Sequence, residues 1–214
     1  MIVLYAGAEY PPILKGHVRD LRALWALEET GLPYQIKYID MGKGEHKEAP
    51  YRAINPFGKI PAIADDGRPL FESGAIIWHL ATTSGKLLPS GEWGRAQALQ
   101  WAFCALNTVE TPFLELFAAD IFAKDAPDYD HRRKRAHDYV EQRLQIMDAH
   151  FKANDFVMGK EFMAPDILMA HALNFMSHTD VYANFPHSKT YMERCHARPA
   201  FLRALARQKA KAAA

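Results

Sequence analysis

The sequence predicts an α/β domain over residues 1–83 followed by an all-helical domain over residues 91–214. Up to residue 83, short apolar runs and amphipathic segments alternate in the order β-α-β and then β-β-α. After residue 91, every periodic segment has the spacing of a helix. The stretch 84–90 between them is rich in Gly, Ser and Pro, which is typical of a linker.

The first half of the α/β domain has the pattern of two parallel strands joined by a helix. Residues 2–5 are a short apolar run, which indicates a strand. Apolar residues between 18 and 27 share one broad helix face, and Gly31 and Pro33 are typical helix-ending residues. Residues 34–39 alternate and indicate a second strand, parallel to the first through a right-handed crossover.

The second half has the pattern of a hairpin followed by a helix. Residues 41–53 are polar, with room for one helical turn. Residues 60–64 and 69–71 are expected to pair as strands around the turn sequence DDGR at 65–68. A helix over 73–83 completes the domain.

In the helical domain the apolar residues recur mostly at spacings of three, four and seven. Pro112 falls inside the first long helix and is expected to kink it. Further helices are expected around 136–151, 167–176, 188–196 and 199–210, with Pro199 opening the last.

The composition is that of an ordinary globular chain. Of the 214 residues, 49% are hydrophobic. The 26 basic and 25 acidic residues give a net charge of +1. This charge gives no electrostatic reason to expect binding to nucleic acid or to a membrane surface. Two distant cysteines, Cys104 and Cys195, suggest reduced thiols. The N-terminus lacks the features of a signal peptide, and no apolar run has membrane-spanning length, so a soluble cytoplasmic protein is expected.

The most informative motif is NPFGKIPAI at 55–63, followed by LFESGAI at 70–76. Proline cannot donate to a sheet, so Pro61 must lie at a strand start or edge. If the Ile60–Pro61 bond is cis, the Ile60 main chain becomes an unpaired edge that an extended peptide could join. Glu72 and Ser73 would lie beside it, at a helix N-terminus suited to a carboxylate. These groups would hold a small acidic peptide that also carries an amino group.

These motifs resemble the glutathione-binding half of the cytosolic-type (bacterial) glutathione transferases. Residues 24–34 (LWALEETGLPY) look like the end of the family's first helix, and FVMG at 156–159 with APDI at 164–167 looks like its C-terminal folding motif. The resemblance implies a thioredoxin-like N-terminal domain, a helical C-terminal domain and a cis bond before Pro61. It also implies a role in detoxification.

In the resembled family, Glu72 would take the ammonium of the γ-glutamyl end of glutathione and Ser73 its carboxylate. Lys59 and His46, with Lys47 beside it, lie in the two loops expected to flank the glycine end. The alternative for each of these three side chains is that it has no binding role, because a single Lys or His on a loop is usually just solvated.

The group that favours the thiolate is harder to assign. The family places a Ser, Tyr or Cys near the end of strand one or the start of helix one, but this chain has no Ser before Ser73 and no Cys before Cys104. A nucleophilic protein cysteine is therefore disfavoured. Tyr10 is the first candidate and Tyr5 the second; the alternative role of each is packing, with the hydroxyl bonded to water or the main chain. The cationic alternatives near the start of the first helix are His17, Arg19 and Arg22.

The expected activity is conjugation of glutathione, as co-substrate and without a metal, to electrophilic apolar small molecules in a cleft between the domains of a homodimer. Phe103, Phe113 and Phe117 could line the acceptor site, although core packing is the simpler role for each. Two alternatives remain open: a glutathione-dependent dehalogenase, lyase or peroxidase on the same site, and a non-catalytic binding protein of the same fold.

Overall fold

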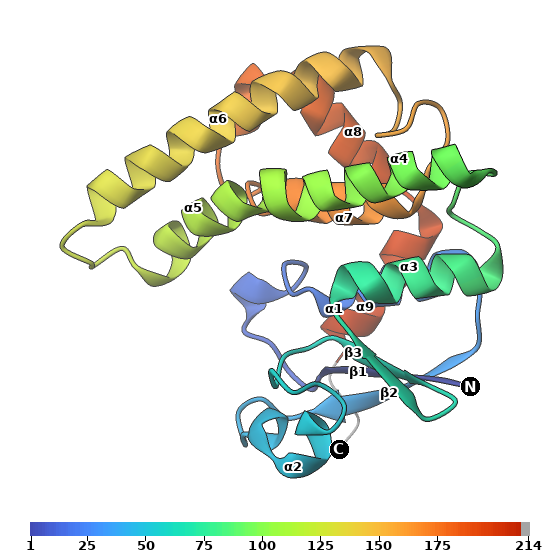
Figure 1. Cartoon of the computed structure of the whole chain (residues 1–214). Helices are drawn as coiled ribbons and strands as arrows, with labels where there is room; N and C mark the ends of the chain where they lie inside the picture. The colour runs from blue at the N-terminus through green and yellow to red at the C-terminus, as the bar shows by residue number, and fades with distance from the viewer. Residues whose placement is uncertain (211–214) are drawn as a thin grey trace. The chain divides into compact units, whose positions relative to one another are not determined.

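A four-stranded mixed sheet forms the centre of the first of two units in the computed structural model, which describes residues 1–210 (Figure 1). The strand order is β2-β1-β3-β4. β1 runs parallel to β2 and antiparallel to β3, and β3 and β4 pair as an antiparallel hairpin. The strands are β1 (Ile2–Gly7), β2 (Tyr34–Ile39), β3 (Ala62–Asp65) and β4 (Arg68–Phe71).

Helices cover both faces of this sheet (Figure 1). α1 (Asp20–Thr30) and α3 (Ser73–Ser84) pack on one face, and the short α2 (Ala49–Arg52) lies on the other. Gly31 ends α1 with a φ of 73°, a left-handed conformation that glycine adopts without a steric penalty. The expected β-α-β, β-β-α order and the thioredoxin-like fold are confirmed.

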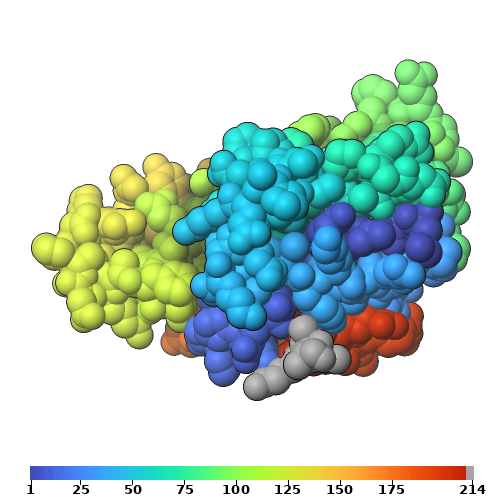
Figure 2. All heavy atoms as spheres, turned by 90° about the horizontal axis from the view of Figure 1, so that it is seen from below, coloured from blue at the N-terminus to red at the C-terminus, as the bar shows by residue number. Residues whose placement is uncertain are grey.

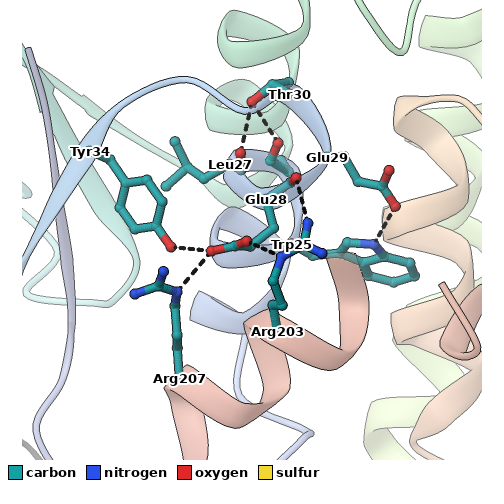
Figure 3. Close-up of polar contacts among 9 residues, drawn as sticks. Trp25, Leu27, Glu28, Glu29, Thr30, Tyr34, Arg203 and Arg207 are labelled. Carbon is teal, nitrogen blue, oxygen red and sulfur yellow. Dashed lines mark hydrogen bonds and ion pairs between the residues drawn. The ribbon is translucent and has the colours of Figure 1, made fainter. Parts of the chain in front are cut away.

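The last helix, α9 (Pro199–Lys209), belongs to this first unit and not to the helical one. Arg203 and Arg207 reach Glu28 on α1, with Nε–Oε distances of 2.6 and 2.8 Å (Figure 3). The ring of Phe201 meets that of Trp25 edge-on at 4.8 Å between centroids. The helical domain expected to run to residue 214 therefore ends near residue 197, because apolar and ionic contacts tie α9 to α1. Its predicted tail, residues 211–214, lies outside the described residues.

The second unit, Leu88–Ala197, is helical among its regular elements. α7 is buried along its length, as the sequence predicted for the third helix, and packs against α4, α5 and α8. α6 packs against α5 and α8. The helices are α4 (Glu92–Phe103), α5 (Glu110–Phe122), α6 (Tyr129–Ala153), α7 (Ala164–Asn174) and α8 (Pro186–His196).

The helix expected to kink at Pro112 is interrupted one turn earlier, by a π-helical segment η3 (Cys104–Val109) between α4 and α5. Pro112 has no N–H to donate to the carbonyl of Thr108. Arg143 Nε donates to that carbonyl instead, at 3.2 Å. Among residues 1–210, no helix is both long and apolar enough to cross a membrane.

Candidate functional site

One end of the sheet brings the two halves of the NPFGKIPAI and LFESGAI motifs together. Ala62 pairs with Phe71 across the β3–β4 hairpin. The next residues outward, Pro61 and Glu72, therefore leave the sheet side by side. The Ile60–Pro61 bond is cis, as predicted.

The main chain of Ile60 is an unpaired edge within the described part of the protein, where no hydrogen bond to its N–H or C=O is found. The residue before it is held firmly. The carbonyl of Lys59 accepts from the Tyr51 hydroxyl at 2.6 Å and from Asn55 Nδ2 at 2.7 Å. Asn55 Oδ1 also accepts from the N–H of Phe57 at 3.0 Å. The turn thus presents the Ile60 main chain in a fixed position.

Glu72 and Ser73 form the start of α3. Glu72 has a φ of 72° and a ψ of 116°. Residues other than glycine rarely adopt this backbone conformation, and it often marks functional positions. The Glu72 side chain is exposed, and among residues 1–210 its carboxylate has no hydrogen-bond or ion-pair partner. The first N–H groups of α3 have no acceptor within the helix, so the positive end of the helix dipole lies beside Glu72 and Ser73.

The side chain of Arg22 contacts the start of α3 from the protein interior. Its guanidinium is fully buried, and Nη1 donates to Ser73 Oγ at 3.2 Å. Because Ser73 accepts this bond, its own hydroxyl proton remains free to donate. A buried cation, a hydroxyl and free main-chain N–H groups together favour an anion such as a carboxylate.

The loops carrying His46 and Lys59 lie against each other. Gly58 has a φ of 61°, and a Cβ at that position would lie 2.6 Å from the carbonyl oxygen of His46. Only glycine fits this close approach without a shift. The Lys59 side chain is exposed, and Nδ1 of the His46 ring is buried without a protein partner among the described residues. In the space-filling view, the light-blue atoms of this part of the chain lie at the surface (Figure 2).

The hydroxyl of Tyr10 is engaged in the protein interior. It donates to Asp20 Oδ2 and accepts from the N–H of Gly7 at 2.8 Å. Burial, followed by the neighbouring Asp20 carboxylate, raises the pKa of Tyr10 above its ordinary value. Its single proton is therefore already committed to Asp20.

Two further candidates for the thiol site, Tyr5 and His17, lie in different surroundings. Tyr5 packs with Tyr51, at 5.8 Å between ring centroids, beside the buried cluster that covers the α2 face of the sheet. Its ring also lies under Lys37 Nζ, at 5.7 Å. His17 lies in the last turn before α1, where its N–H donates to the carbonyl of Leu14 at 2.9 Å.

The three candidate acceptor-site phenylalanines do not share one environment. Phe113 and Phe117 are buried, and the ring of Phe117 packs 5.2 Å from that of Phe175. Phe103 is 59% exposed on α4. These positions suit core packing for the first two side chains and leave only Phe103 accessible.

Sequence reasoning gave no role to Asn55, Asp20 or Gln208. Asn55 stood within the quoted motif, and an Asn directly before a Pro is a usable signal for a side chain that hydrogen-bonds to the main chain of a turn. Asp20 and Gln208 had no such signal, because their partner lies 188 residues away along the chain. No group of three or more His, Cys, Asp or Glu side chains suited to a metal occurs in residues 1–210.

Comparisons with known proteins cover most of the chain. The family model of the glutathione S-transferase N-terminal domain matches residues 21–83, and that of the C-terminal domain matches residues 103–199. The disulfide-bond oxidoreductase YfcG of Escherichia coli (strain K12) is 30% identical over 213 residues, which cover 96% of this chain and 94% of that protein. Glutathione S-transferase F9 of Arabidopsis thaliana is 29% identical over 177 residues, 80% of this chain and 79% of that protein.

A solved glutathione transferase from Burkholderia graminis, with two glutathione molecules bound per subunit, matches with a TM-score of 0.84 at 26% identity. The match covers 95% of this chain and 87% of that one. A thioredoxin-like domain joined to a helical domain is the architecture of the glutathione transferases. The chain belongs to the glutathione S-transferase family.

Proposed function

We propose that this protein binds glutathione along the Ile60 main chain and transfers its thiolate to electrophilic, mostly apolar small molecules. Glutathione would lie antiparallel to Ile60, with its γ-glutamyl end at Glu72 and Ser73. Lys59 and His46 would face its glycine carboxylate.

The observation that carries this proposal is the unpaired Ile60 main chain beside the positive start of α3. An extended tripeptide can pair with such an edge, as in strand addition. Its carboxylate would meet the Ser73 hydroxyl and the first N–H groups of α3, with the Arg22 guanidinium behind them. Its ammonium would meet the exposed Glu72 carboxylate.

Glutathione binding is tested by titration calorimetry on Glu72→Ala and Ser73→Ala. Each variant removes one charge-assisted hydrogen bond, so we expect each to weaken binding about tenfold or more. Thr83→Ala, an exposed position at the other end of α3, is the matched control and should bind like the unmodified protein. Undiminished affinity in both site variants would contradict the proposed site.

Disulfide exchange by bound glutathione is a second candidate activity. The chain is similar over 96% of its length to a disulfide-bond oxidoreductase. Tyr10 has its proton committed to Asp20, so its hydroxyl has none left to donate to the glutathione thiolate in either reaction. In disulfide exchange the glutathione thiolate attacks a disulfide sulfur and forms a mixed disulfide, and the other sulfur leaves as a thiolate. No protein cysteine is required.

A substrate panel separates these activities. The protein is assayed with glutathione and an aryl halide, a small organic disulfide and an organic hydroperoxide. We expect the highest kcat/KM with the aryl halide if conjugation is the main reaction. Preference for the disulfide favours the second candidate, and preference for the hydroperoxide a peroxidase. Glutathione binding without turnover of any of them would identify a binding protein.

We also propose a homodimer, as the family resemblance implies. Exposed apolar side chains occur on α4 and α6 of the second unit: Trp93, Phe103, Tyr139 and Ile146. Covering these side chains in a dimer would remove apolar surface from water, which favours association. Light scattering after gel filtration measures the mass directly.

A further inference from the structure

The loop between β1 and α1 is held by three buried side chains, Tyr10, Asp20 and Gln208, here called the Asp20 cluster. Asp20 is only 1% exposed. It accepts hydrogen bonds from the Tyr10 hydroxyl, from the N–H of Gly7 at 3.2 Å and from Gln208 Nε2 at 2.5 Å. The carboxylate thus joins the end of β1, the middle of the loop and the last helix.

Gln208 carries the connection from α9 into the second half of the loop. Its Oε1 accepts from the N–H of Gly16 at 2.8 Å, and its Nε2 also donates to the carbonyl of Val18 at 3.2 Å. The side chain is 7% exposed. A single amide from the far end of the sequence therefore fixes two main-chain positions just before α1.

Burying the Asp20 cluster costs folding free energy, because its polar groups leave water. Within residues 1–210 no cation forms an ion pair with Asp20, and its partners are a hydroxyl, an N–H and an amide. Burial raises the pKa of Asp20, which shows that the charged form is disfavoured there. Apolar side chains would stabilise the fold at lower cost, whereas a fully hydrogen-bonded buried network selects one conformation of the loop.

The topology places this loop at the proposed glutathione site. β1 is antiparallel to β3, and Tyr5 near the end of β1 pairs with Ala62 at the start of β3. The loop after β1 therefore leaves the sheet at the same end as Pro61 and Glu72. A thiol at the centre of a tripeptide bound to that edge would face this loop.

We propose that Gln208 and Asp20 are positioning residues, through which the C-terminal helix sets the conformation of the loop that contacts the glutathione thiol. The proposal rests on the proposed function. It assigns α9 a role in the reaction without contact with glutathione. The thiol-specific part of binding should then depend on the Asp20 cluster, while the binding of the rest of the tripeptide should not.

The test compares Gln208→Ala with Arg203→Ala in the full-length protein. Arg203 lies on the same helix and is 53% exposed, and its replacement breaks an ion pair with Glu28 without touching the loop. Calorimetry gives the Kd of glutathione and of S-methylglutathione, which lacks the thiol proton. Thiolate absorbance gives the pH at which half of the bound thiol is ionised.

For Gln208→Ala we expect glutathione binding to weaken about tenfold more than S-methylglutathione binding, as for the loss of one well-placed hydrogen bond. The pH of half-ionisation should rise. Gln208→Glu keeps the side-chain volume but sets an oxygen against Asp20, and it should act in the same direction. Arg203→Ala should move neither readout.

Equal losses for both ligands in Gln208→Ala and Gln208→Glu, or equal effects of Gln208→Ala and Arg203→Ala, would overturn the inference and leave Gln208 a merely structural residue. Failure of the proposed function looks different, because the unmodified protein would then bind neither ligand.

Discussion

Asp120 shows how one residue can join three segments of the helical unit. It accepts from Tyr129 OH at 3.0 Å, Arg133 Nε at 2.8 Å and His178 Nε2 at 3.1 Å. Burial by itself would raise its pKa. The hydrogen bonds from His178, Tyr129 and Arg133 outweigh that effect and hold the pKa of Asp120 below its ordinary value.

We therefore predict that Asp120→Asn lowers the free energy of unfolding by about 2 kcal/mol at pH 7. A carboxyl whose folded pKa is lowered stabilises the fold above its unfolded pKa, and this contribution is lost as pH falls through the folded value. The deficit of the variant should therefore shrink below about pH 4. Urea unfolding at pH 7 and pH 3 measures both effects.

Asp138→Asn is the matched control, because it removes only an exposed pair with Lys134 on the same helix. It should change the free energy of unfolding by less than about 0.5 kcal/mol. A deficit in Asp120→Asn that is the same at both pH values would contradict the argument.

For single residues, the sequence predicted contacts between neighbours in the chain better than contacts between residues far apart in it. Pro61, Glu72 and Ser73 could be placed because a hairpin register and a helix start follow from neighbouring residues. Asp20 could not, because its burial depends on Gln208 at the other end of the chain. The commitment of the Tyr10 proton was hidden for the same reason: a tyrosine in a loop shows its partner only after folding.

At the scale of elements, the strands and most helices followed from periodicity. The hairpin was predicted from its turn residues, and α1 from its apolar face and Gly31. The π-helical segment η3 was not predicted, because Pro112 indicates an interruption but not how the free carbonyl finds a donor. That donor is Arg143 on α6, a tertiary contact.

The helix α9 was predicted as a helix but was expected to belong to the helical domain, whereas it groups with the first unit. Its 3.6-residue period is a local property, whereas its packing partner is not. The arginines at 203 and 207 face Glu28, which is only 9% exposed on α1 (Figure 3). Complementary charge on two helices so far apart in sequence is visible only in the structure.

At the scale of the whole molecule, we predict that the chain cannot be divided at its linker. A fragment of residues 1–87 lacks α9, so Trp25 loses its contact with Phe201 and Glu28 loses both arginines. Losing such a large buried aromatic contact costs about 3 kcal/mol or more. We expect this fragment to be largely unfolded by circular dichroism and amide exchange.

A fragment in which residues 1–87 are joined to residues 198–210 by a flexible Gly/Ser linker is the control. It restores the contacts between α1 and α9 and should fold cooperatively. Cooperative unfolding of both fragments with the same midpoint would show that α9 is dispensable for the first unit.

The return of α9 to α1 also has a consequence during synthesis. On the ribosome, the first eighty or so residues emerge early, but the helix that covers α1 is translated only after the helical unit. The apolar side of α1 stays uncovered by α9 in the nascent chain while the whole helical unit is made, a delay of roughly 5 to 20 seconds at ordinary elongation rates. Chaperones that bind exposed apolar helices would have this interval in which to act.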